Sequence, residues 1–174
     1  MITIISGTNR LNSNSIFVAE YYQSLLKKKG AECQILDLRK LPENFLFTAL
    51  YENADKDPAF NKLKAMINRS EKFVFIVPEY NGSFPGVLKA FIDGLDFPES
   101  FENKKCALVG ISSGVLAGAL ALSHLTDILN YLGMHVLALK PRLPKIESLI
   151  KNGAINDEFL TGLLDAQAEA LIKF

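Results

Sequence analysis

The sequence predicts an open α/β fold in which parallel strands alternate with helices. Short apolar runs of strand length, such as residues 73–77, alternate with longer segments whose apolar residues recur at helical spacing. Glycine or proline marks several junctions between the two kinds of segment. No repeat, low-complexity stretch or linker interrupts this alternation, so we expect one domain over residues 1–174.

Strands are expected where a short apolar run is bounded by polar or turn-forming residues. Five segments meet this description: residues 2–6, 32–38, 73–77, 105–112 and 134–139. Most are rich in Ile, Val, Leu and Phe on both faces, which is typical of strands buried between two layers of helices.

Helices are expected where apolar residues recur every three or four positions, over residues 14–29, 58–68, 87–95, 116–132 and 157–173. Gly30 and Gly133 follow the first and fourth helices, and Pro58 opens the second. Asn156 or Asp157 is a suitable N-cap for the last helix.

Between the second strand and the second helix, residues 41–57 follow neither period and are expected to be irregular. Five strands with intervening helices match the flavodoxin-like strand order 2-1-3-4-5. The sequence therefore predicts a flavodoxin-like three-layer sandwich with a five-stranded parallel sheet.

Composition excludes several classes of partner. The 174 residues are 49% hydrophobic and 22% charged, and 19 basic residues balance 19 acidic ones. A net charge of zero gives no electrostatic reason to expect nucleic acid or an anionic membrane as partner. Cys33, Cys106, His124 and His135 are isolated in sequence, so we expect reduced core thiols and no metal site.

Nothing in the sequence indicates targeting to a membrane. The first residues lack the basic start, apolar stretch and cleavage site of a signal peptide. No apolar run approaches the ~20 residues of a transmembrane helix. The expected location is the cytoplasm.

The loop after the first strand is suited to bind a phosphate. Seven of the nine residues from Gly7 to Ser15 carry a hydroxyl, an amide or a guanidinium, and the loop runs into a helix N-terminus, which stabilises anions. The members expected to bind are Thr8, Arg10, Ser13, Asn14 and Ser15. The alternative is simple helix capping, but a cap requires only one such residue.

Two better-known phosphate motifs do not fit this loop. A Walker loop ends in Gly-Lys-Ser/Thr, whereas Asn12, Ser13 and Asn14 stand here. A dinucleotide-binding fingerprint has three spaced glycines, and only Gly7 is present.

The loop after the third strand combines groups that suit a flat, polar-edged ring. It begins with Pro78, Glu79, Tyr80, Asn81 and Gly82. As an alternative, Asn-Gly is a turn dipeptide and the prolines and serine that flank it suit a helix start, but this leaves Glu79 and Tyr80 unexplained. Backbone N–H groups near Asn81 and Gly82 can bond the polar edge of a ring, and Tyr80 can supply a stacking face.

The loop after the fourth strand begins with Ser112, Ser113 and Gly114, and its small residues allow a ligand to approach the backbone closely. Tight packing of helix on strand would explain it equally well. In a 2-1-3-4-5 sheet, however, the loops after strands one, three and four meet at one edge, beside the switch point of the fold. Their convergence favours a mononucleotide.

Other polar residues have structural explanations. Lys89 and Asp93, four apart on a helix, are expected to form a weak surface pair. His124 lies among apolar residues of the fourth helix, so a packed or partly exposed histidine is favoured over a catalytic one. No Ser-His-Asp or Cys-His constellation is apparent. The sequence therefore predicts no catalytic side chain.

These motifs resemble those of the NADPH-dependent FMN reductase family of flavodoxin-like proteins, which includes chromate, quinone and azo-dye reductases. The first loop resembles the family pattern Gly-Ser-x-Arg-x-x-Ser-x-Asn through Gly7, Thr8, Arg10 and Ser13, with Ser15 in place of the final Asn. The second pattern, Pro-Glu-Tyr-Asn followed by Pro-Gly-x-Leu-Lys, is matched by residues 78–81 and 85–89.

The resemblance implies noncovalently bound FMN, with NAD(P)H as electron donor. The first loop would hold the phosphate, and residues 78–82 and 112–114 would line the isoalloxazine ring. Electrons would pass through the flavin to a small acceptor: a quinone, an azo compound, a metal oxyanion or free flavin. The resemblance also implies a homodimer or homotetramer that uses the helix after the second motif, where Ala90 and Gly94 replace the Asn and Trp common in the family.

Two alternatives to a reductase stay open at this point. An FMN-binding electron carrier without useful NAD(P)H turnover would share the pocket, although such carriers are usually strongly acidic and this chain is neutral. A flavodoxin-like scaffold with an empty site would not need the polar first loop.

Overall fold

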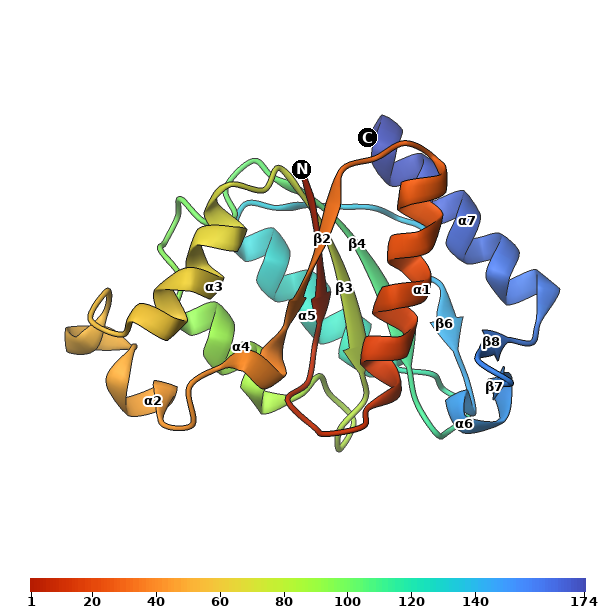
Figure 1. Ribbon diagram of the computed structural model, residues 1–174, viewed down its shortest axis with the longest axis horizontal. Coiled ribbons are helices and arrows are strands. Elements are labelled where there is room, and N and C mark those ends of the chain that lie inside the picture. Colours follow the sequence, from red (N-terminus) through yellow and green to blue (C-terminus); the bar gives the residue numbers. More distant parts are fainter.

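The computed structural model describes residues 1–174 and consists of a twisted parallel sheet between two layers of helices (Figure 1). The sheet order is β2-β1-β3-β4-β5, which confirms the expected flavodoxin-like topology. The strands are β1 (Ile2–Ser6), β2 (Cys33–Asp37), β3 (Lys72–Pro78), β4 (Lys105–Ile111) and β5 (His135–Val136). A further short strand, β6 (Arg142–Leu143), also pairs with β4.

Each face of the sheet is covered by its own set of helices. One apolar cluster joins the sheet to α1 (Asn14–Lys28) and α7 (Glu158–Lys173). The other joins it to α3 (Pro58–Asn68), α4 (Gly86–Asp93) and α5 (Ala119–Tyr131). The bounds of α3 agree with the sequence prediction, and the Asp157 carboxylate caps α7 by accepting from the Leu160 N–H at 3.0 Å. Because both faces are buried, the central strands β1, β3 and β4 are mostly apolar along their length.

The prediction of a fifth strand over residues 134–139 is wrong beyond Val136. After β5 the chain leaves β4, and it pairs again only at β6, where Arg142 and Leu143 lie opposite Gly110 and Ile111. Pro141 between them has no N–H to donate to a ladder. The fully buried Gln167 of α7 donates to the Leu139 carbonyl at 2.7 Å and also to the β4 backbone, which compensates for the interrupted pairing.

Helix α5 begins three residues later than expected. Ala117 and Gly118 have positive φ values of 52° and 79°, outside the right-handed helical region. A Cβ at Gly118 would lie 3.3 Å from the Gly110 Cα, so a side chain at this position would be both strained and crowded. Residues 112–118 therefore form a loop between β4 and the start of α5.

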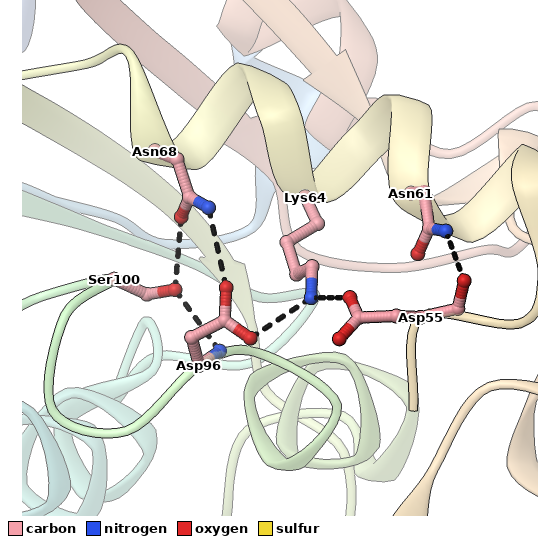
Figure 2. Close-up of polar contacts among 6 residues, drawn as sticks. All are labelled: Asp55, Asn61, Lys64, Asn68, Asp96 and Ser100. Carbon is pink, nitrogen blue, oxygen red and sulfur yellow. Dashed lines mark hydrogen bonds and ion pairs between the residues drawn. The ribbon is translucent and has the colours of Figure 1, made fainter. Parts of the chain in front are cut away.

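The expected irregular segment, residues 41–57, contains two short helices, α2 (Phe45–Thr48) and η2 (Tyr51–Asn53), after η1 (Leu38–Lys40). Lys64 of α3 anchors it. Figure 2 shows the Lys64 ammonium between the carboxylates of Asp55 and Asp96, at 2.8 Å from Asp96. Ser100 and Asn68 complete the network by hydrogen bonding to each other and to Asp96 (Figure 2). One nearly buried lysine thus ties two loops to one helix.

The chain between β6 and α7 forms elements that the sequence analysis did not predict. They are α6 (Ile146–Leu149) and a hairpin of β7 (Ile150–Lys151) and β8 (Ala154–Ile155). The hairpin turn is Asn152-Gly153, with φ values of 51° and 73°. Asn-Gly in a two-residue turn is the strongest short-range hairpin signal, so this element was detectable in the sequence.

The loops that follow β1, β3 and β4 gather at one edge of the sheet, the lower edge in Figure 1. Helix α6 lies at the same edge (Figure 1). None of the helices combines the length and apolar character needed to cross a bilayer.

Candidate functional site

The β1–α1 loop is fixed to the sheet by close backbone packing. The Gly7 N–H donates to the Ile76 carbonyl at 2.9 Å, and a Cβ at Gly7 would lie only 2.7 Å from that oxygen. Glycine is therefore required where the loop leaves β1. The next residue, Thr8, is fully buried, and its hydroxyl accepts from the Arg10 N–H at 3.2 Å.

Two buried hydroxyls in this loop have no partner within the protein. They are Ser13 Oγ, at the N-cap of α1, and Ser15 Oγ, in its first turn. Ser13 does not cap the helix with its side chain, and the first turn of α1 carries no acidic residue. Buried polar atoms are nearly always hydrogen-bonded, so two unpaired hydroxyls beside free helix N–H groups are candidates for binding a ligand.

These residues line one side of a cavity of about 340 Å³, which we call the phosphate-side cavity. The residues of the first loop that line it are Arg10, Asn12, Ser13, Asn14 and Ser15. Its other walls are Pro78, Tyr80 and Ile111 at the carboxyl ends of the strands, with Ile146 and Glu147 of α6. A guanidinium, hydroxyls and a helix N-terminus facing one cavity suit a phosphate group.

The loop after β3 contains a tight turn that exposes backbone donors. The Tyr80 N–H donates to the Ser83 carbonyl at 2.8 Å, and the Ser83 N–H donates back to Tyr80 at 3.1 Å. Asn81 and Gly82 between them have φ values of 52° and 75°, as in a type I′ turn. Their own N–H groups take no part in these bonds and are free to meet the edge of a ligand.

The side chains of this loop tie it to three other parts of the fold. The Tyr80 hydroxyl is 2.9 Å from the Thr8 hydroxyl in the first loop. The Glu79 carboxylate accepts from the Gly118 N–H at 2.9 Å, just before α5. Ser83 Oγ lies 3.0 Å from Nδ1 of His124, an exposed residue of α5. The turn is thus held from both sides.

A second cavity, of about 450 Å³, lies between this turn and the loop after β4; we call it the ring-side cavity. Its lining residues are Glu79, Asn81, Gly82, Ser112, Ser113, Gly114, Val115 and Leu116. The Ser112 hydroxyl exchanges hydrogen bonds of 3.1 Å with the backbone of Gly114, which fixes the start of the loop. A lining that combines small polar residues with apolar Val115 and Leu116 suits a flat ring.

The structure brings all of the predicted site residues together, in two groups. Arg10, Ser13, Asn14, Ser15, Pro78 and Tyr80 line the phosphate-side cavity, and Glu79, Asn81, Gly82, Ser112, Ser113 and Gly114 line the ring-side cavity. Thr8 is buried behind them and bonds to Tyr80. Tyr80, expected to stack on the ring, lines the phosphate-side cavity instead.

Helix α6 supplies a wall that the sequence analysis did not predict. The Ile146 N–H donates to the Ser112 carbonyl at 3.0 Å, and the Lys145 N–H donates to Gly114 at 3.2 Å. These bonds place Ile146 and Glu147 against the phosphate-side cavity. The signal available in the sequence was the Asn152-Gly153 turn, which requires a hairpin just after this segment.

No catalytic or metal-binding cluster accompanies the cavities. No group of three or more His, Cys, Asp or Glu residues could hold a metal ion. Both cysteines are free, and burial raises the pKa of the Cys106 thiol to about 12, which keeps it protonated. Lys89 and Asp93 form the expected i,i+4 pair at 2.6 Å. The arrangement offers groups suited to bind and orient a ligand and no Ser-His-Asp or Cys-His constellation.

Comparisons with known proteins agree with the fold. Residues 1–140 match the family model described as NADPH-dependent FMN reductase. The chain belongs to this family. An NAD(P)H-dependent FMN reductase of Pseudomonas aeruginosa is 28% identical over 99% of this chain and 90% of its own length. An FMN-dependent NADPH-azoreductase of Staphylococcus aureus is 31% identical over 74% of this chain and 69% of its own.

One solved structure superposes on almost the whole of this chain. It is a flavoenzyme NAD(P)H:(acceptor) oxidoreductase from Paracoccus denitrificans, with a TM-score of 0.78 and 26% identity. The match covers 99% of this chain and 94% of that one. The resemblance noted in the sequence motifs is therefore confirmed at the level of family and fold.

Proposed function

We propose that this chain is an FMN-dependent oxidoreductase that passes electrons from NAD(P)H through noncovalently bound FMN to a small acceptor. The observation that carries the proposal is the pair of buried, partnerless hydroxyls, Ser13 Oγ and Ser15 Oγ, at the N-terminus of α1. They line the phosphate-side cavity, and the ring-side cavity is formed by loops at the same sheet edge. Family membership supports the same class of activity.

The first loop would hold the FMN phosphate. Arg10 supplies the positive charge, Ser13 and Ser15 supply hydroxyl donors, and the N-terminus of α1 supplies free N–H groups. Asn14 lines the same wall. Thr8 holds Arg10 and Tyr80 in place through its own hydrogen bonds.

The ring would lie between the Tyr80–Ser83 turn and residues 112–116. The N–H groups of Asn81 and Gly82 are placed to bond its polar edge, and Ser112, Ser113 and Gly114 allow close approach from the other side. When bound, FMN supplies the redox chemistry by accepting electrons from the nicotinamide nucleotide and passing them on. The protein orients the ring and shields one face of it.

An electron carrier is the second candidate, because it would use the same two cavities. The zero net charge of the chain counts against it, since carriers of this fold attract their partners through strong acidity. Reduction of the bound flavin by NADPH or NADH, followed under anaerobic conditions, separates the two. Rapid bleaching of the flavin colour supports the oxidoreductase, and a flavin that stays oxidised with both nucleotides identifies a carrier.

We also propose that the chain forms a homodimer or homotetramer through the face that carries α4 and α5. An apolar cleft of about 450 Å³ lies between these helices, and Phe97 and Tyr131 at its rim are 65% and 81% exposed. The rings of this pair stack at 6.3 Å. Two exposed aromatic rings beside an apolar cleft favour burial against a second chain. Light scattering of the purified protein measures the number of chains directly.

A further inference from the structure

A groove beside the ring-side cavity has a lining suited to phosphate groups, and the FMN site does not use it. It has a volume of about 360 Å³ and runs between α5 and the edge segment that ends in β6. Its walls are Ala119, Leu122, Ser123, Thr126 and Asp127 of α5, facing Lys140 and Arg142. We call it the α5–β6 groove.

Both cations of the groove are available for a ligand. Lys140 is half-buried, yet it forms no ion pair and donates no side-chain hydrogen bond within the protein. Arg142 makes a single long contact, 3.4 Å, to the carbonyl of Leu116. In a chain of zero net charge, two unpaired cations facing one groove form a local positive site. The Ser123 hydroxyl adds a donor from the opposite wall, whereas the Thr126 hydroxyl already donates to the Leu122 carbonyl at 2.6 Å.

The one carboxylate of the groove lies away from its entrance. Asp127 is eight residues beyond Ala119 on α5, a distance of about 12 Å along the helix axis. Arg142 lies at the entrance, because β6 pairs with the end of β4 and the guanidinium reaches Leu116. The guanidinium of Arg142 therefore lies where the groove meets the loop after β4.

The groove and the ring-side cavity are neighbours at this loop. Arg142 of the groove contacts the carbonyl of Leu116, which lines the ring-side cavity. Ala119, at the start of the groove, follows directly on Gly118, whose N–H is bound by Glu79 of the ring-side cavity. A ligand that begins in the ring-side cavity and passes Leu116 therefore reaches Arg142.

We propose that the α5–β6 groove binds the phosphates of the nicotinamide nucleotide while its nicotinamide lies over the flavin. This rests on the proposed function, since it assumes FMN in the two cavities. The FMN phosphate occupies the cradle around Arg10, so the donor requires separate cations for its own phosphates. Lys140 and Arg142 are cations of the groove that form no ion pair, and charge-assisted hydrogen bonds from Lys and Arg are the strong contacts to phosphate.

The test measures NADP⁺ and NAD⁺ binding to the oxidised holoenzyme, together with the kinetics of flavin reduction. The variants are Lys140→Ala and Arg142→Gln, alone and combined; glutamine retains an amide donor for the Leu116 carbonyl. Lys151→Ala, an exposed residue of the β7–β8 hairpin, is the matched control. Loss of a charge-assisted contact should weaken NADP⁺ binding about tenfold in the double variant.

The same variants should raise the KM for NADPH by a similar factor while flavin reduction at saturating NADPH and FMN affinity stay within about twofold of wild type. Added salt should weaken NADP⁺ binding less in the double variant than in the wild type. A larger loss for NADP⁺ than for NAD⁺ assigns the groove to the 2′-phosphate, and an equal loss assigns it to the pyrophosphate.

Unchanged NADP⁺ and NAD⁺ affinities in the double variant would overturn the proposal. So would a loss of affinity that coincides with a change in the number of chains per particle, because the groove would then be a subunit interface. Failure of the proposed function looks different: the wild-type flavin would not be reduced by either nucleotide, whereas NADP⁺ binding can still be measured by titration.

Discussion

Glu79 Oε2 accepts a hydrogen bond of 2.9 Å from the backbone N–H of Gly118, which joins the loop after β3 to the start of α5. Gly118 has a φ of 79°, a conformation that its packing against Gly110 restricts to glycine. The bond therefore fixes the separation of the two loops that line the ring-side cavity. In this account Glu79 positions the walls of the pocket, and no proton transfer is assigned to it.

Glu79→Ala should weaken FMN binding because the Gly118 N–H loses its acceptor. A hydrogen bond to a charged group corresponds to about a tenfold change in affinity. Glu79→Gln keeps an acceptor oxygen for the same N–H, so it should bind FMN nearly as well as the wild type. Fluorescence titration of the apoprotein measures both variants. Equal losses for alanine and glutamine would show that the charge matters and the bond does not.

Arg10→Ala should weaken FMN binding more than riboflavin binding, because only FMN carries the phosphate. Arg10 lines the phosphate-side cavity together with Ser13 and Ser15. Parallel titrations with the two flavins give the ratio of their affinities in wild type and variant. An equal loss of affinity for both flavins would show that Arg10 does not bind the phosphate.

Gly7→Ala should destabilise the fold, since the new Cβ would lie 2.7 Å from the backbone oxygen of Ile76. Forcing a group into such a space costs about 1–3 kcal/mol. Gly86→Ala is the matched control: it opens α4, has no atom within 4 Å of the new Cβ and has no positive φ, so its effect should stay within about 1 kcal/mol. Urea denaturation gives the free energy of unfolding of both variants. Similar losses of stability would mean that the backbone around Gly7 shifts to accommodate the new Cβ.

The Lys64 network should make stability depend on pH on the acid side. The hydrogen bond from Lys64 lowers the pKa of Asp96 below its usual value. Such a carboxylate stabilises the fold above its unfolded-state pKa, roughly 4, and the contribution is lost as the pH falls toward the lower folded pKa. Asp96→Asn should therefore lose less stability than the wild type over the same acidification. Thermal unfolding of both proteins across that pH range measures the difference. The same change of stability with pH in both would show that Asp96 does not contribute to the pH dependence.

The sequence was sufficient to predict the order of the sheet and the loops that meet at its edge. Parallel α/β topology follows from the alternation of strand-like and helix-like hydrophobic patterns. In this topology the loops after strands one, three and four must converge at the switch point. The bounds of α3 were predictable because Pro58 opens it and apolar positions repeat without interruption. The predicted site residues all lie at that edge for the same reason.

The remaining differences arise from tertiary contacts that a local pattern does not contain. Residues 134–139 have strand composition, but the pairing with β4 stops after Val136, and the Gln167 side chain instead donates to the Leu139 carbonyl. The contact between the hydroxyls of Tyr80 and Thr8 joins residues 72 positions apart, and no local pattern could have predicted it. Glu147 lines the phosphate-side cavity because backbone hydrogen bonds hold residues 145 and 146 against residues 112–114.

The most direct test of the account is an anaerobic titration of the FMN-loaded protein with NADPH, followed by the visible absorbance of the flavin. The account predicts that the purified protein binds one FMN per chain, releases it on denaturation, and loses its yellow colour as NADPH is added. A protein that binds no FMN would contradict the three-loop pocket, and bound FMN that stays oxidised with both NADPH and NADH would contradict the oxidoreductase.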